Sequence, residues 1–200
     1  MLQRDTTTQG RGGNWTPRSV GDTFSKAGYC GSSFNSGLVR FHDEASGTEV
    51  STLAGDAFGS VARYVGFFAF DWLGRQIGLI DAEYGQAGMP ETLIFDIGAG
   101  EIRGVGSLEE FVERLSDGTI KQLLSEDALV TWKEANPGRT ISFTECVGLI
   151  HPLFLGGQAT LENLEICDIS VYWTVMGGVY QKTRDLPDST VIGEVRGRQY

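Results

Sequence analysis

The stretch Val65-Gly-Phe-Phe-Ala-Phe-Asp-Trp-Leu-Gly-Arg-Gln-Ile-Gly-Leu-Ile-Asp81 carries the pattern that decides the fold. When its first half is extended, both faces carry large apolar side chains, which is typical of a strand buried on both sides. Leu73-Gly74 then supplies a turn, because glycine adopts the positive φ that a tight hairpin needs. A helix would lose up to about 1 kcal/mol at each glycine relative to alanine. We therefore predict a central hairpin with arms Val65–Trp72 and Arg75–Asp81 and with Phe68 and Phe70 buried.

The remaining sequence mixes predicted helices and strands without strict alternation. Extended segments are predicted at Gly37–His42, Glu91–Asp96, Glu101–Arg103, Thr140–Phe143, Glu145–Leu155, Thr160–Asp168 and Thr190–Gly193. Helices are predicted after Thr16-Pro17, over Glu44–Phe58, behind Ser107, from about Ile120 to Ala135, and from Ile169 to about Lys182. This order favours an α+β fold, with a mostly antiparallel central sheet flanked by helices.

Length and composition indicate one globular domain. The 200 residues suffice for a real core. We expect a flexible tail over residues 1–15, the domain over residues 16–184, and a polar C-terminal tail over residues 185–200. No apolar run approaches a membrane span, and the N-terminus has no apolar signal region. Three cysteines without metal-type spacing favour reduced thiols in a cytoplasmic protein, with Cys146 and Cys167 buried and Cys30 also reduced.

The net charge of −10 is concentrated in the middle of the chain. Residues 21–136 carry eight basic and eighteen acidic side chains. Such a body disfavours nucleic acid as a ligand, because phosphates are neutralised by clustered Lys and Arg. It is compatible with a basic protein partner, although acidic composition also serves solubility alone.

The sequence offers no complete catalytic or cofactor motif. Gly98-Ala-Gly100 begins like a dinucleotide fingerprint but lacks the third glycine, so a turn explains it better. Cys146 and His151 would lie on opposite faces of an extended segment, which disfavours a nucleophilic pair. His42-Asp43-Glu44 offers metal-binding side chains, but at a strand-to-helix junction helix capping is favoured. We therefore expect no enzyme, no cofactor and no metal site.

Two blocks resemble a known bacterial family. The first is Phe67-x-x-x-Asp71-Trp-Leu-Gly-Arg-Gln76, and the second runs from Glu145-Cys-Val-Gly through Pro152, Gly156-Gly157 and Glu162-Asn163 to Asp168. They are similar to the signature blocks of the C-terminal domain of type VI secretion immunity proteins. The resemblance covers about residues 37–183 and leaves out the N-terminal domain to which that domain is often fused, so the chain resembles a stand-alone version.

The resemblance implies a cytoplasmic protein that binds a co-encoded antibacterial toxin, typically a DNase, and blocks it. We interpret the family-motif residues as mainly structural. We give less weight to the alternative that they line a groove for a ligand or partner. They are Asp71, Trp72, Gly74, Arg75, Glu145, Pro152, Gly156, Gly157, Glu162, Asn163 and Asp168. We expect Arg75 to pair with Asp71, Glu145 or Glu162, because an unpaired buried guanidinium is costly.

Three functional readings remain open from the sequence. The first is toxin neutralisation through an acidic surface, for which the candidate residues are Glu109, Glu110, Glu113 and Asp117. The alternative for Glu109 and Glu110 is simple stabilisation of a helix N-terminus. The second reading is a regulatory or scaffold module that binds a cellular protein. The third is an enzyme or small-ligand binder with a pocket near Arg75, Glu145 and His151.

Overall fold

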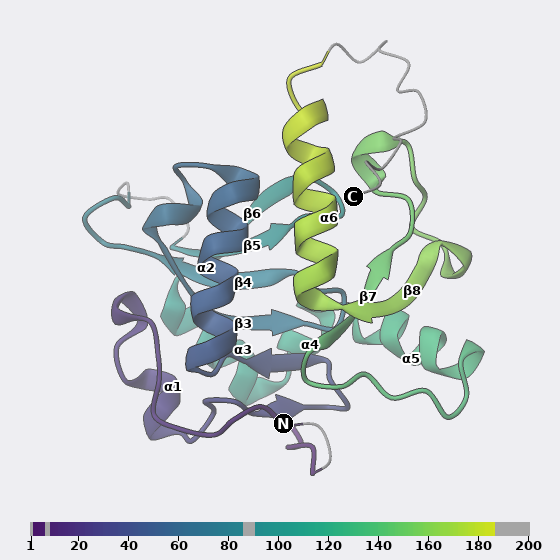
Figure 1. Ribbon diagram of the computed structural model, residues 1–200. Helices are drawn as coiled ribbons and strands as arrows, with labels where there is room; N and C mark the ends of the chain where they lie inside the picture. Colours follow the sequence, from purple (N-terminus) through teal and green to yellow (C-terminus); the bar gives the residue numbers. More distant parts are fainter. Residues whose placement is uncertain (1, 7–8, 86–90, 187–200) are drawn as a thin grey trace.

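The core of the protein is a six-stranded antiparallel sheet in which each strand pairs with the next along the chain. The computed structural model describes residues 2–6, 9–85 and 91–186. Figure 1 shows the strands side by side. They are β1 (Ser33–Phe34), β2 (Val39–Phe41), β3 (Val65–Asp71), β4 (Gln76–Ile80), β5 (Thr92–Asp96) and β6 (Glu101–Gly106).

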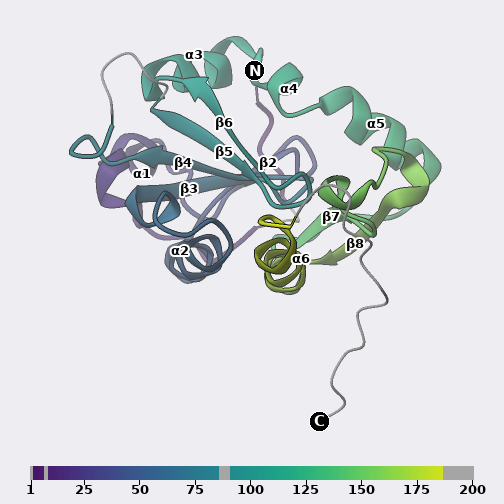
Figure 2. The same cartoon turned by 90° about the horizontal axis from the view of Figure 1, so that it is seen from above.

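Helices cover both faces of this sheet. On one face α2 (Glu44–Phe58) packs beside α6 (Ile169–Thr183), and on the other lies a chain of three helices (Figure 2). These are α3 (Leu108–Asp117), α4 (Ile120–Leu123) and α5 (Glu126–Ala135), while the short α1 (Thr23–Lys26) lies near the N-terminus. A two-stranded sheet, β7 (Glu145–Leu149) with β8 (Leu164–Asp168), completes the fold. The predicted α+β class with a mostly antiparallel sheet is confirmed.

The predicted central hairpin is also confirmed. β3 and β4 occupy the two middle positions of the sheet, and Phe68 and Phe70 are buried. Neighbouring residues of β3 serve different cores, because Phe67 packs in the cluster under α2 and α6 whereas Phe68 packs with α3 on the opposite face. Gly74, with φ of +77°, makes the turn between the two strands.

Two helices begin at the caps that the sequence indicates. The Asp43 side chain accepts a hydrogen bond from the N–H of Ser46, and Ser107 does the same for Glu110, in both cases within a reciprocal capping box. The capping interpretation of Asp43 is therefore confirmed. No helix among the residues described has both the length and the apolar character needed to cross a membrane.

Several segments differ from the predicted elements. Residues 140–143, predicted to be extended, lie outside the strands, and the segment predicted to be extended from Thr160 begins with a 3-10 turn at Leu161–Asn163 before β8. The helix expected over residues 120–135 is broken at Ser125, where φ is +60°, into α4 and α5. The helix expected after Pro17 is divided by Gly21 into a 3-10 turn and α1. The extended region expected up to Leu155 ends at Leu149 and is followed by a 3-10 turn at Leu153–Leu155. Each break comes from a local φ or a proline that periodicity does not reveal.

The described part of the N-terminal segment is attached to the sheet, unlike the flexible tail expected over residues 1–15. The N–H of Asp5 donates to the Ser33 carbonyl at 2.9 Å, and its carboxylate accepts from the N–H of Ser36 and Gly37. Further on, the Arg11 N–H donates to Asp43 at 2.8 Å. The strand predicted at residues 190–193, and the expected tail beyond residue 186, lie outside the described residues.

Candidate functional site

Asp71 and Arg75 form a buried ion pair at the end of the central hairpin. The Arg75 Nε donates to Asp71 Oδ2 at 2.6 Å, and Nη2 lies 2.5 Å from the same oxygen. The other carboxylate oxygen accepts the backbone N–H of Leu73 and of Arg75, each at 3.0 Å. Although burial opposes ionisation, the adjacent Asp71 carboxylate raises the pKa of Arg75. The predicted carboxylate partner of Arg75 is therefore Asp71, and the pair holds the turn closed.

Arg40 is a second buried cation, which the sequence reasoning missed. Its guanidinium donates to four carbonyl oxygens, those of Ser142 at 2.7 Å, Asp71 at 3.0 Å, Phe143 and Glu145. The guanidinium carbon also lies 4.5 Å from the centre of the Phe70 ring. The available signal was an arginine inside the apolar strand pattern of residues 38–42. Arg40 thus ties β2 and the end of β3 to the start of β7.

The two family-like blocks meet at the turn between β3 and β4. The indole of Trp72 is fully buried and donates to the Leu124 carbonyl at 3.0 Å, while the Trp72 carbonyl accepts from the N–H of Val147 at 2.7 Å. A side chain at Gly74 would lie 2.9 Å from the sulfur of Cys146. Trp72 and Gly74 therefore fix β7 against the central hairpin.

Asn163 holds together the loop between β7 and β8. Its carbonyl oxygen accepts the His151 N–H, and its amide donates to the His151 and Gln158 carbonyls, all at 2.8 Å. Gly157 has no room for a side chain, because a Cβ there would lie 2.1 Å from the His151 carbonyl oxygen. Pro152 precedes the 3-10 turn, and Gly156 ends it with φ of +87°. All four motif residues thus have contacts within the fold.

The three acidic motif residues of this block take different positions. Glu145 accepts the backbone N–H of Ser142 at 2.9 Å. Asp168 caps α6 by accepting the N–H groups of Ser170 and Val171 in the first turn of the helix. Glu162 is exposed, and hydrogen bonds to its own backbone N–H and to Thr160 lower its pKa. None of the three is placed beside Arg75 by a hydrogen bond or ion pair in the described part of the chain.

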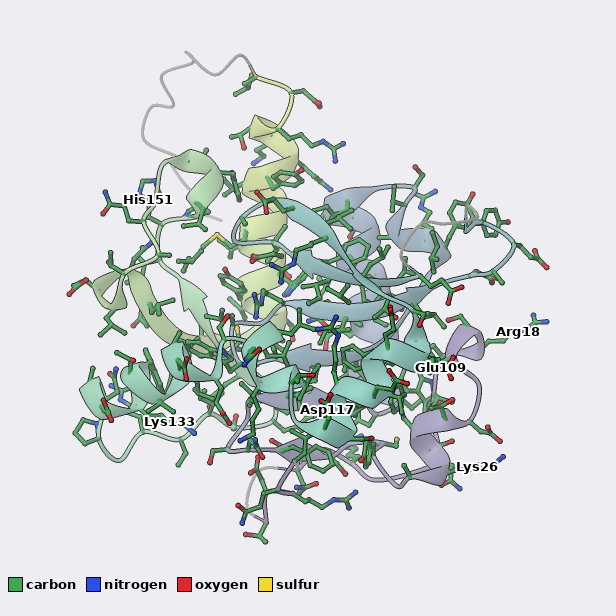
Figure 3. All side chains as sticks on the ribbon, turned by 180° about the vertical axis from the view of Figure 1, so that it is seen from behind. Arg18, Lys26, Glu109, Asp117, Lys133 and His151 are labelled. Atoms are coloured by element: carbon green, nitrogen blue, oxygen red, sulfur yellow. The ribbon has the colours of Figure 1, made fainter. Side chains whose placement is uncertain are left out.

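The acidic group on α3 divides into two pairs. Glu110 accepts the Ser107 N–H at 2.8 Å, and Asp117 accepts both the N–H and the hydroxyl of Thr119. These two residues therefore cap or shape the helix ends. Glu109 and Glu113 are exposed, and the structure assigns them no ion pair within the described ranges. Figure 3 shows Glu109 and Asp117 on the sheet face opposite α2 and α6.

The main cavities among the described residues are not lined by Arg75, Glu145 or His151, around which the sequence suggested a pocket. Arg75 faces Asp71, Glu145 faces a backbone N–H, and His151 is exposed (Figure 3). Cys146 is fully buried, so the exposed His151 does not form a nucleophilic pair with it. The small-ligand site suggested from the sequence is therefore considered at the cavity described next.

A cavity of about 460 Å³ lies between the N-terminal halves of α2 and α6 and the sheet. Its apolar walls include the rings of Phe70, Phe143 and Trp173. At its base, His42 bonds through one ring nitrogen to Ser46 and through the other to Gln76, both at 3.0 Å. Sequence reasoning missed this cavity because its lining comes from separate segments. The strongest available signal was His42, a polar residue at the end of an apolar strand.

Burial lowers the pKa of His42 to about 4, and the nearby positive charge of Arg40 acts in the same direction. His42 is therefore neutral near pH 7. At the base of the cavity it forms hydrogen bonds with Ser46 and Gln76 and adds no charge. The carboxylates of Asp43, Glu49 and Asp168 outnumber the cationic Arg11 along the lining. A buried polar pair beside aromatic walls is the usual composition of a small-ligand site.

The three cysteines lie in two places. Cys30 is buried near the N-terminal segment, whereas Cys146 and Cys167 face each other across β7 and β8 with sulfurs 3.8 Å apart. Cys146 is buried as expected, but Cys167 is partly exposed and so differs from its prediction. Among the described residues, no group of three or more His, Cys, Asp or Glu side chains is arranged to hold a metal ion.

Comparisons with known proteins establish a likeness of fold. Searches against protein-family models and against curated proteins find no match. Among solved structures, the chain is similar to Atu4351 from Agrobacterium tumefaciens, with 13% sequence identity and a TM-score of 0.50. The alignment covers 72% of this chain and 68% of that one. At this identity the likeness concerns the arrangement of strands and helices.

Proposed function

We propose that this protein is an immunity protein that binds a co-encoded antibacterial toxin and neutralises it by protein–protein contact. The proposed toxin is a type VI secretion effector with a basic, DNA-cleaving surface. The observation that carries the proposal is that Glu109 and Glu113 are exposed in an acidic chain and form no ion pair with any other described residue. The proposal also rests on the family resemblance of the two sequence blocks.

The position of the acidic pair suits recognition of a basic surface. Glu109 and Glu113 are four residues apart on α3 and therefore share one side of the helix. Phe111 and Leu115 are buried on the opposite side. An enzyme that cuts DNA needs a positive groove for phosphates, and carboxylates on a rigid helix can occupy such a groove.

The motif residues concern the scaffold of the protein and not its contact with the toxin. Asp71, Trp72, Gly74 and Asn163 are engaged in contacts within the fold, so they maintain the scaffold. Glu110 and Asp117 likewise serve the ends of α3. This leaves Glu109 and Glu113 as the members of the acidic group that are available for a partner.

The test is the association rate between this protein and the toxin encoded by the neighbouring gene. Steering between opposite charges is screened over about 8–10 Å at physiological salt, so the rate should fall by roughly tenfold or more between low and high salt. The double variant Glu109→Lys/Glu113→Lys should associate slowly and lose most of this salt dependence. It should also fail to protect cells that express the toxin.

A matched control is the double variant Glu83→Lys/Glu165→Lys. Both residues are exposed, one after β4 and the other in β8, and the change in net charge is the same. This control should associate almost like the wild type. A rate that is independent of salt and equal in both double variants would rule out the acidic pair as the recognition surface. Absence of any complex with the neighbouring gene product would rule out the immunity function itself.

The cavity between α2 and α6 favours a second candidate function, the binding of a small molecule. Its aromatic walls, the His42–Gln76 pair and the surplus of carboxylates suit a small cationic ligand with an apolar body. Binding is measured by the fluorescence of Trp173 during titration with aromatic amines. Leu53→Trp would fill the cavity, so it should abolish the response and leave toxin association unchanged. Titration without a response in the wild type would contradict this candidate.

A further inference from the structure

Cys146 and Cys167 lie directly opposite each other in the β7–β8 pair, although they are 21 residues apart in the chain. Backbone hydrogen bonds fix the register on both sides of them. The Ile169 N–H donates to the Thr144 carbonyl, and the Ile150 N–H donates to the Asn163 carbonyl, each at 2.9 Å. Because hydrogen-bonded and non-bonded pairs alternate along an antiparallel ladder, both bonds make Cys146 and Cys167 a hydrogen-bonded pair.

This pairing places the two backbones at a separation that a disulfide requires. Opposed residues in a hydrogen-bonded pair have Cα atoms about 5.5 Å apart, which is a common separation for disulfides. The two sulfurs are 3.8 Å apart in the thiol form. Opposed Cβ atoms in a sheet are about 4.5–5.5 Å apart and a disulfide needs about 3.5–4.5 Å, so the bond forms by side-chain rotation together with a small approach of the two strands, without a change of register.

We propose that Cys146 and Cys167 form a reversible dithiol–disulfide site that is oxidised by hydroperoxides. The site is separate from the acidic surface of α3 and does not depend on the toxin. Cys30 takes no part, because it lies near Gly13 and beside the N-terminal segment.

The two thiols are suited to different steps. Cys167 is partly exposed, so a peroxide can reach it, whereas Cys146 is fully buried against Gly74. The hydrogen bond from Cys146 lowers the pKa of Cys167, and the same bond together with burial raises the pKa of Cys146. The thiolate is the nucleophile in such reactions, so Cys167 reacts with the peroxide first.

The reaction has two balanced steps. The Cys167 thiolate attacks one peroxide oxygen, the O–O bond breaks, and the departing oxygen takes a proton to leave as an alcohol, or as water from hydrogen peroxide. Cys167 is then a sulfenic acid. The Cys146 sulfur attacks the Cys167 sulfur, the S–O bond breaks, and water leaves with the thiol proton. Two electrons pass from the thiols to the peroxide, and a thiol reductant returns them.

The disulfide would close the loop that contains Asn163 and the glycine pair at residues 156–157. It would also join β7, which lies against the turn at Gly74, to β8. A cross-link around a loop of this size restricts the unfolded chain, and for a protein of this length the melting temperature should rise by about 5–10 °C. Oxidation therefore stabilises the fold at the junction of the two family-like blocks.

The experiment treats the reduced full chain with one equivalent of hydrogen peroxide. Mass spectrometry should show the loss of two hydrogens and a peptide that joins Cys146 to Cys167. The melting temperature should rise and return to its starting value with dithiothreitol. Cys167→Ser should remove both the cross-link and the rise. Cys30→Ser is the matched control and should retain both.

Three results would overturn the proposal. They are oxidation of Cys167 to sulfinic acid without a cross-link, a cross-link that includes Cys30, and a disulfide between two chains. Since Cys146→Ser alters a fully buried residue and risks unfolding, the test rests on Cys167→Ser, whose side chain is partly exposed. A cross-link that forms without any rise in melting temperature would also contradict the stabilising role.

Discussion

The guanidinium of Arg40 donates a hydrogen bond to the carbonyl oxygen of Ser142, which lies 102 residues later in the chain. The carbonyls of Asp71 and Glu145 accept from the same guanidinium. The charge is thus surrounded by backbone dipoles, and no carboxylate of the described residues forms an ion pair with it. Burial lowers the pKa of Arg40 to about 10, so the side chain still carries its charge near pH 7.

We predict that Arg40→Met destabilises the protein by about 3 kcal/mol or more. The carbonyls of Phe143 and Glu145 would lose their donor, at about 1–3 kcal/mol each, whereas those of Asp71 and Ser142 also accept the N–H of Gly74 and of Glu145. Urea denaturation measures the change in the free energy of unfolding. Arg103→Met, at an exposed position of β6, is the control and should change stability by no more than about 0.5 kcal/mol. Equal losses in the two variants would contradict the structural role of Arg40.

The Asp71–Arg75 pair gives a second prediction. Arg75→Lys should destabilise the fold by about 1–3 kcal/mol, because an ammonium group cannot reproduce the two-nitrogen contact with the carboxylate. Asp71→Asn should cost more, about 3–5 kcal/mol, since it leaves a buried guanidinium without its counter-charge. Thermal and urea unfolding of both variants measure these losses. A wild-type unfolding curve for Arg75→Lys would show that the pair does not hold the turn.

The buried His42 predicts a loss of stability in mild acid. Its pKa is about 4 in the folded protein and about 6.5 in the unfolded chain, so the unfolded chain binds the proton more readily. The contribution is complete above pH 6.5 and is lost as the pH falls toward 4, up to roughly 3 kcal/mol. His42→Gln should flatten this part of the profile of unfolding free energy against pH. His151→Gln, at an exposed histidine, should leave it unchanged.

Phe68 tests the central strand itself. The ring is almost completely buried and contacts the rings of Phe24 and Phe111. Phe68→Ala should lower the free energy of unfolding by about 3–5 kcal/mol, because it removes a large buried ring and leaves a cavity. Tyr84→Ala, at a half-exposed aromatic ring, should cost clearly less. A cost below 1 kcal/mol for Phe68→Ala would mean that the core of β3 is loosely packed.

The elements with strong local signals could be predicted from the sequence. The apolar run of residues 65–72 and its glycine turn identified the central hairpin, and Asp43 and Ser107 identified the starts of two helices. These features depend on neighbours along the chain. The break at Ser125 could not be predicted, because it accompanies the contact between Trp72 and the Leu124 carbonyl, 52 residues apart.

The candidate sites were less accessible to sequence reasoning. The acidic group on α3 was visible as a cluster, but its division into capping and free carboxylates needed hydrogen bonds such as that of Glu110 to Ser107. The cavity beside His42 joins segments from residues 9 to 173 and leaves no spacing pattern. The facing of Cys146 and Cys167 likewise depends on the register of two strands.

The strand order also has a consequence for how the chain folds as it is synthesised. Because β1 to β6 pair in sequence order, each strand finds its partner as soon as the ribosome releases it. Arg40 is released early, yet its acceptors at residues 142–145 follow about a hundred residues later. At translation rates of about 5–20 residues per second, roughly 5–20 seconds pass between the synthesis of Arg40 and that of these acceptors. The guanidinium can be fully buried only after that. The first two thirds of the chain can therefore assemble the sheet, and the last third completes the packing against it.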